Sequence, residues 1–121
     1  MTQTAYKTLE LIVKAADDRL AQDIMVMEVS NLTPLADYFV VMHASNEKQL
    51  GAIVDAIIDA AHKANVAIKN VEGKESGKWI LIDAYDVVVH VFYHTERSHY
   101  NIEKVWKDAP LVDVSDWITE Q

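Results

Sequence analysis

The sequence has no cysteine, and its 11 lysines and arginines are outnumbered by 19 acidic residues. Without cysteine, disulfides and thiolate metal sites are excluded, and nothing indicates an oxidising compartment. The sequence also lacks internal repeats, low-complexity runs and a domain linker. Its 121 residues, half of them hydrophobic, are enough for one globular domain that buries about two-thirds of its unfolded surface.

The shortage of basic residues leaves a formal net charge of −8, which repels the phosphate backbones of nucleic acids. No stretch clusters Lys and Arg with aromatic residues, so direct nucleic-acid binding is not expected. An acidic surface would speed the encounter with a basic protein. The alternative is that the acidic charge serves solubility alone, and charge by itself favours this alternative.

The first 20 residues do not have the composition of a signal peptide or a membrane span. Charged side chains interrupt their apolar positions, namely Lys7, Glu10, Lys14, Asp17, Asp18 and Arg19. A cytoplasmic protein is therefore expected.

Hydrophobic periodicity predicts three helices and five strands. The first helix is expected over residues 4–21, and the third from a cap at Thr95 to Pro110. The second is expected to end near residue 64 and to be capped by Ser45 or by Asn46, which could form a capping box with Gln49. β-branched and aromatic runs predict strands at residues 24–29, 38–43, 66–71, 79–83 and 87–93.

This order of elements predicts an α/β fold of the mixed α+β kind, with helices packed on a five-stranded mixed sheet. The single domain is expected to span residues 1–109 and to be followed by a tail, residues 110–121. Three arrangements of the tail remain open: an extra turn, an extra strand, or exchange with a second copy.

Residues 72–92 hold the strongest strand signal and a tight reversal between two strands. With Ala84 and Tyr85 as the loop, three cross-strand pairs are expected: Trp79 with His90, Leu81 with Val88, and Asp83 with Asp86. Because side chains alternate along a strand, one face is plain core, made of Ile80, Ile82, Val87, Val89 and Val91. The other face combines aromatic, aliphatic and acidic side chains, as a partner surface does: Trp79, Leu81, Asp83, Asp86, Val88, His90 and Phe92.

Ordered motifs along the chain resemble the Iojap or ribosomal silencing factor (RsfS) family. The resemblance extends from the first helix to Trp106, and its carriers are ADYFVV at 36–41, Glu72-Gly73, WILID at 79–83, DVVVHVF at 86–92, Arg97, Tyr100, Glu103 and Trp106. Two positions depart from the family pattern. The hairpin has Ala84-Tyr85 in place of Tyr-Gly, and His99 replaces an aromatic residue. Without the glycine, a four-residue type I turn is expected to keep Trp79 opposite His90.

The resemblance implies a protein that binds the large ribosomal subunit through its fourteenth ribosomal protein, on the subunit-joining face. Occupying that face would block the small subunit and repress translation, and organellar relatives act in large-subunit assembly. The implied fold is similar to nucleotidyltransferases without their catalytic motif. No enzyme activity, cofactor, metal or membrane contact is implied.

The partner-binding residues expected on this basis are Glu72, Gly73, Trp79, Leu81, Asp83, Asp86, His90 and Phe92, with possible support from Asp37, Tyr38, Arg97 and Tyr100. Each also has a purely structural interpretation. Trp79 would be core if a helix covers it, and His90 would be a core histidine bonded to Asp83, Asp86 or Tyr100. Arg97 would be the intramolecular partner of a carboxylate.

Two alternatives to a ribosome-binding repressor remain. A magnesium-dependent nucleotidyltransferase needs converging carboxylates and a Gly-Ser loop, whereas residues 43–46 contain no glycine. A metal site from His90, His94 and His99 lacks helix-face spacing, and no hydrolase triad can be named. The second alternative is a homodimeric module that uses the same apolar face on itself and competes with ribosome binding.

Overall fold

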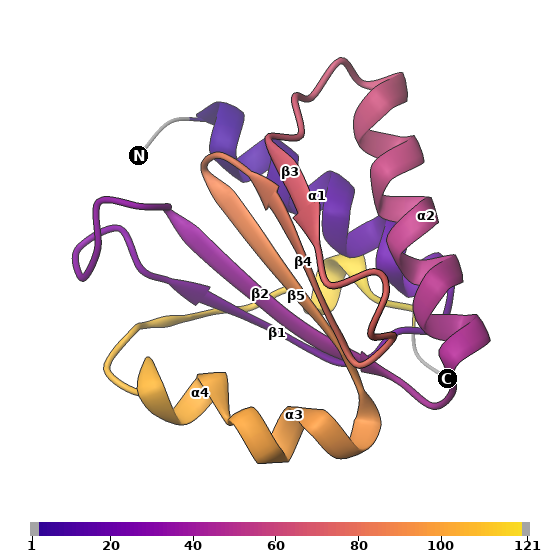
Figure 1. Cartoon of the computed structure of the whole chain (residues 1–121). Coiled ribbons are helices and arrows are strands. Elements are labelled where there is room, and N and C mark those ends of the chain that lie inside the picture. The colour runs from indigo at the N-terminus through magenta and orange to yellow at the C-terminus, as the bar shows by residue number, and fades with distance from the viewer. Residues whose placement is uncertain (1–2, 120–121) are drawn as a thin grey trace.

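The computed structural model describes residues 3–119, with a six-stranded sheet between two groups of helices. The long helices α1 (Gln3–Asp18) and α2 (Glu47–Lys63) cover one face. The short helices α3 (His94–Tyr100) and α4 (Ile102–Val105) pack on the other, below the sheet in Figure 1. The mixed α/β single domain agrees with the prediction, and its likeness to nucleotidyltransferases stays a prediction.

The strands follow the order β3-β4-β5-β2-β1-β6 across the sheet. Their bounds are β1 Gln22–Glu28, β2 Tyr38–Ala44, β3 Asn70–Glu72, β4 Trp79–Ala84, β5 Val87–Tyr93 and β6 Leu111–Val112. The pair β2 and β5 at the centre is parallel, and all the other pairs are antiparallel. The sheet is therefore mixed, as predicted.

The prediction of five strands is wrong because the tail contributes a sixth. Leu111 and Val112 pair with Met27 and Val26 of β1. A strand of two residues is too short to show a period of two, so no sequence pattern marks it. The strand predicted over residues 66–71 is shorter than expected, since only Asn70–Glu72 pairs with β4.

The C-terminal tail packs against the rest of the domain. After β6, a 3₁₀ turn (Ser115–Trp117) places Trp117 against Tyr6 of α1, with ring centroids 5.2 Å apart. The backbone N–H of Thr119 donates to a carboxylate oxygen of Asp17 at 2.9 Å. The tail thus forms both an extra strand and an extra turn, and the division of the chain at residue 109 stays a prediction.

The cap of α2 is confirmed and that of α3 is not. Asn46 accepts a hydrogen bond from the backbone N–H of Gln49 at 2.8 Å, and the Gln49 side chain accepts from the N–H of Ser45 at 2.8 Å. The third helix begins at His94 without a side-chain cap, so Thr95 is not its cap. Asn101, with φ of 50°, then ends α3 before α4 begins.

The register of the central hairpin differs from the expected one by two residues. The loop is Tyr85-Asp86, and Ala84 pairs with Val87, so Trp79 lies opposite Phe92, Leu81 opposite His90, and Asp83 opposite Val88. Tyr85 takes a φ of 66°, and its N–H donates to the Asp83 carboxylate at 2.9 Å. A tyrosine therefore supplies the left-handed position, and the expected type I turn is not present.

The predicted division into two faces is confirmed for the residues within the strands, because a shift of two residues leaves each of them on its own face. Asp86, expected on the Trp79 face, lies in the turn instead. One core lies between the sheet and helices α1 and α2, and it includes Ile80, Ile82, Val87, Val89 and Val91. A second, smaller core lies under α3 and α4 and contains Phe39, Val41 and Phe92. Within residues 3–119, none of the helices combines the length and apolar character needed to cross a bilayer.

Candidate functional site

Trp79 lies where the short helices leave the second face of the sheet partly uncovered. It begins β4 and is half-buried. Its indole stacks on Phe92 with centroids 5.1 Å apart and contacts Tyr100 of α3 at 4.5 Å. Tyr100 is 45% exposed, so helix α3 shields Trp79 without burying it. An aromatic ring fixed in this way and still reachable can be buried by a partner.

His90 lies beneath Trp79 and holds its indole. The indole N–H of Trp79 donates to Nδ1 of His90 at 3.2 Å, so the expected partners Asp83, Asp86 and Tyr100 are not the ones used. His90 is only 5% exposed, and its burial lowers its pKa to about 4. The ring is therefore neutral at pH 7, with its proton on Nε2. No described residue accepts a hydrogen bond from this Nε2.

Other expected partner-binding residues lie beside Trp79 with different exposure. Leu81 and Asp83 are half-buried on β4, and Glu72, which pairs with Leu81, is exposed. Phe92 is fully buried, so it supports the indole from below and offers no contact surface of its own. The exposed part of the site is a row along β4 with Glu72 at its edge.

Asp37 and Asp86 lie next to each other at the far end of this row. There the turn between β4 and β5 contacts the residue that precedes β2. The backbone N–H groups of Asp37 and Tyr38 donate to the Asp86 carbonyl at 2.8 and 3.1 Å. Trp79 and Asp83 are four positions apart on β4, or roughly 13 Å. Asp83, Asp37 and Asp86 are thus at a distance from the indole, whereas Glu72 lies nearer to it, opposite Leu81 on the neighbouring strand.

Tyr38 does not belong to this surface. Its side chain lies on the opposite face, in the core under α1 and α2, and is 2% exposed. Burial raises the pKa of Tyr38, with smaller contributions from the charges of Glu28 and Asp37. The alternation along β2 places Phe39 on the Trp79 face instead.

Arg97 joins helix α3 to the sheet and to α4. Its Nε donates to Oε2 of Glu103 at 3.1 Å, and its Nη1 contacts Nδ1 of His43 at 2.9 Å and the Gln22 carbonyl at 3.4 Å. The expected pairing of Arg97 with a carboxylate is confirmed. Burial and the nearby guanidinium lower the pKa of His43. Arg97 therefore fixes the helix that carries Tyr100.

Two aromatic residues under the site were not predicted as part of it. Phe39 contacts His90 at 5.4 Å and Trp106 at 5.0 Å, both edge to face. These rings, with Val88 and Ile102, close the second core beneath His90. Both residues are in the motifs of the resemblance, and that signal could have identified them.

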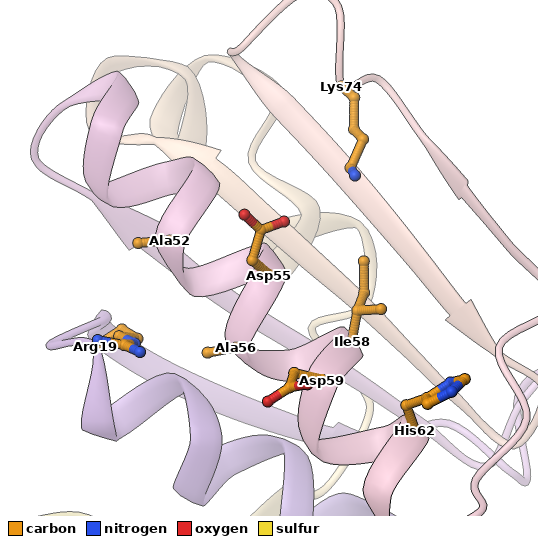
Figure 2. Close-up of a pocket in the computed structure, with 8 residues that line it drawn as sticks. All are labelled: Arg19, Ala52, Asp55, Ala56, Ile58, Asp59, His62 and Lys74. Atoms are coloured by element: carbon orange, nitrogen blue, oxygen red, sulfur yellow. The ribbon is translucent and has the colours of Figure 1, made fainter.

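A different hollow, of about 660 Å³, lies on the outer side of α2, in the opposite layer. Figure 2 shows Arg19 and Lys74 on either side of a helix face with Asp55, Asp59 and His62. None of the expected partner-binding residues lines it. Among the described residues, no group of three His, Asp or Glu side chains is placed to hold a metal ion.

Comparisons with known proteins agree with the motifs. The family model described as "Ribosomal silencing factor during starvation" matches residues 2–121. The chain is 42% identical over 106 residues to "Ribosomal silencing factor RsfS" of Bacillus subtilis, an alignment that covers 88% of this chain and 90% of that protein.

Two further relatives extend the comparison. A crystal structure of a Bacillus halodurans protein superposes with a TM-score of 0.81 at 38% identity and covers 90% of this chain and 99% of that one. A mouse protein named "Mitochondrial assembly of ribosomal large subunit protein 1" is 26% identical over 102 residues, which cover 81% of this chain and 44% of that protein.

Proposed function

The chain belongs to the ribosomal silencing factor family, and from this premise we propose that it represses translation by binding the large ribosomal subunit in the cytoplasm. The contact is the fourteenth protein of that subunit, on the face that joins the small subunit. Occupancy of that face prevents joining by steric exclusion, so the protein acts without catalysis. An effect on large-subunit assembly is part of the same proposal.

The observation that carries this proposal is the half-exposed Trp79, held between Phe92 and Tyr100 on the partly uncovered face of the sheet. Interfaces take most of their binding energy from a few aromatic side chains that a partner desolvates. Exposed acids at Glu72 and Asp86 flank the row and attract a basic ribosomal protein. The name of the mouse relative, which refers to the large subunit, supports the same partner.

Co-sedimentation with purified large subunits tests the proposal. The unchanged protein is expected to pellet with them, and Trp79→Ala is expected to weaken binding about thirtyfold, the effect of losing one central aromatic residue. The far-ultraviolet circular dichroism of the variant should be unchanged. A folded Trp79→Ala protein that pellets like the original would remove Trp79 from the interface.

The chain offers a second test substitution, at Tyr100, with a matched control at Tyr6. Tyr100 and Tyr6 are 45% and 44% exposed, and each contacts a tryptophan, Trp79 and Trp117 respectively. They lie in opposite layers of the domain. Tyr100→Ala should weaken pelleting with large subunits, whereas Tyr6→Ala should not. Equal effects would indicate general destabilisation instead of a binding surface.

Two measurements distinguish the alternatives. For a homodimeric module that uses the same face, light scattering would give a doubled mass that falls when the ribosomal partner is added. For a magnesium-dependent nucleotidyltransferase, calorimetry with Mg²⁺ and a nucleoside triphosphate would show saturable heat that is lost in Asp83→Asn. Saturable heat of that kind would overturn the proposed non-enzymatic function.

A further inference from the structure

His90 is buried in a way that folding alone does not require. It is 5% exposed among Phe39, Trp79 and Phe92. Its Nδ1 accepts from Trp79, while its Nε2 has no partner among the described residues. An unpaired polar group in a core reduces stability, and an apolar ring of similar shape at this position would remove that cost.

We propose that His90 is a positioning residue for partner recognition: its Nδ1 fixes the orientation of the Trp79 indole, and the domain retains an unpaired Nε2–H for this purpose. The inference rests on the proposed function, because it assigns to His90 control of the ring that a partner would bury. It goes beyond that function in separating the residue that contacts the partner from the residue that orients it.

Three contacts define the orientation, and only one of them is directional. Phe92 supports the indole at 5.1 Å and Tyr100 flanks it at 4.5 Å, but ring contacts of this kind tolerate rotation within the ring plane. The hydrogen bond to His90, at 3.2 Å, selects which edge of the indole faces inward. A pre-oriented ring loses less freedom on binding, which increases affinity without adding a contact.

Two substitutions of His90 separate positioning from a purely structural role. His90→Phe removes both nitrogens, so the thermal midpoint should stay the same or rise while binding to large subunits weakens about five- to tenfold, the effect of one lost hydrogen bond. His90→Asn keeps an acceptor close to the Nδ1 position but leaves a cavity and a buried amide. It should therefore lower the midpoint and retain most of the binding. If His90 had a purely structural role, each variant would change the thermal midpoint and the binding to large subunits in the same direction.

Trp79→Phe provides the control for both variants. Phenylalanine has no indole N–H, so in this background His90→Phe should cause no further loss of binding. If His90→Phe still weakens binding fivefold there, His90 acts through something other than Trp79, and the inference is wrong.

A readout without the partner distinguishes failure of this inference from failure of the proposed function. In a ¹⁵N–¹H spectrum, the Trp79 indole resonance, assigned by its loss in Trp79→Phe, should shift and exchange faster with solvent in His90→Phe. An indole resonance that is unchanged in that variant would overturn the positioning role, whatever the ribosome-binding result. If the wild-type protein does not pellet with large subunits and the resonance shifts, the proposed function fails and the control of Trp79 by His90 stands.

Discussion

Gly73 lies directly against the backbone of Trp79, so that a Cβ added at Gly73 would overlap the carbonyl oxygen of Trp79. The φ angle of Gly73 is +89°, a region that side chains rarely adopt. Gly73 therefore supplies a backbone angle at this corner that other residue types rarely adopt. The corner after β3 thus approaches the first residue of β4 more closely than any other residue type would allow.

Gly73→Ala should destabilise the domain by about 2–4 kcal/mol, since backbone strain and backbone overlap combine. Because the overlap involves the Trp79 carbonyl itself, the indole should also move, and its fluorescence should change. Urea unfolding measures the first effect. Gly77→Ala is the matched control: φ is +65° there, and the added Cβ would meet only the Glu47 side chain, at 3.7 Å. That control should lose about 1–2 kcal/mol, from backbone strain alone.

Arg97→Met should destabilise the domain by about 2–3 kcal/mol, because it leaves Glu103 and His43 without their partner in a partly buried site. Arg97→Lys should recover little of this loss, since one ammonium group cannot reach both side chains and the Gln22 carbonyl. Equilibrium urea unfolding measures both variants. Lys63→Ala, which breaks an exposed pair with Asp59, is the control and should change stability by about 0.5 kcal/mol or less. If Arg97→Met lowers stability by no more than the Lys63→Ala control, the contacts of Arg97 with Glu103, His43 and Gln22 do not hold α3 in place.

The sequence predicts which face each side chain of the hairpin occupies, but it does not predict the cross-strand pairs. Alternation along β4 and β5 is a local property, and it survives a shift of the register by two. The register depends on the turn, and the turn depends on Tyr85 accepting a left-handed conformation, which Tyr seldom does. The turn is stabilised by the hydrogen bond from Tyr85 to the Asp83 carboxylate and by those from the start of β2 to the Asp86 carbonyl. The bonds from β2 depend on the tertiary structure, so the local sequence does not indicate them.

The contacts that complete the candidate site come from elements distant in sequence. Arg97 reaches Gln22 and His43, 75 and 54 residues away, and no local pattern predicts such pairs. His90 can be identified from sequence as a core histidine, but which side chain forms a hydrogen bond with it depends on the register of the hairpin. The motifs that resemble the family include Trp79, His90 and Tyr100, whose side chains the fold brings together, and their role in binding stays a prediction. The helix break at Asn101 has no sequence signal apart from the residue type itself.

Stability should fall as the pH is lowered from about 6.5 to 4, and His90 should account for much of the fall. Its folded-state pKa, about 4, is below its usual value of 6.5, so the unfolded chain binds the proton first and acid favours unfolding. His43, whose pKa is also lowered, contributes with the same sign. Between pH 7 and pH 4.5 the His90 contribution is about 2–3 kcal/mol. In His90→Phe, urea unfolding at the two pH values should show a difference smaller by about that amount. An equal pH dependence in both proteins would mean that His90 is not the group responsible.

Charge reversal at the acidic side of the surface should slow association with the large subunit without a matching change in the dissociation rate. Glu72 is exposed at the edge of the row and Asp86 is exposed in the turn beyond its far end, and the chain carries a net charge of −8. Under the proposed function, each should contribute to the attraction of a basic ribosomal protein. In Glu72→Lys/Asp86→Lys the association rate at low salt should fall about tenfold, and the difference should shrink as added salt screens the charges.

The control reverses two exposed acids in the opposite layer, Asp18 and Asp55, which changes the net charge by the same amount. Stopped-flow mixing with fluorescently labelled protein measures both. If the control slows association equally, net charge governs the encounter and the surface around Trp79 has no directional role. If only the first pair slows it, the acids at the edge and at the far end of the row guide the partner to this surface.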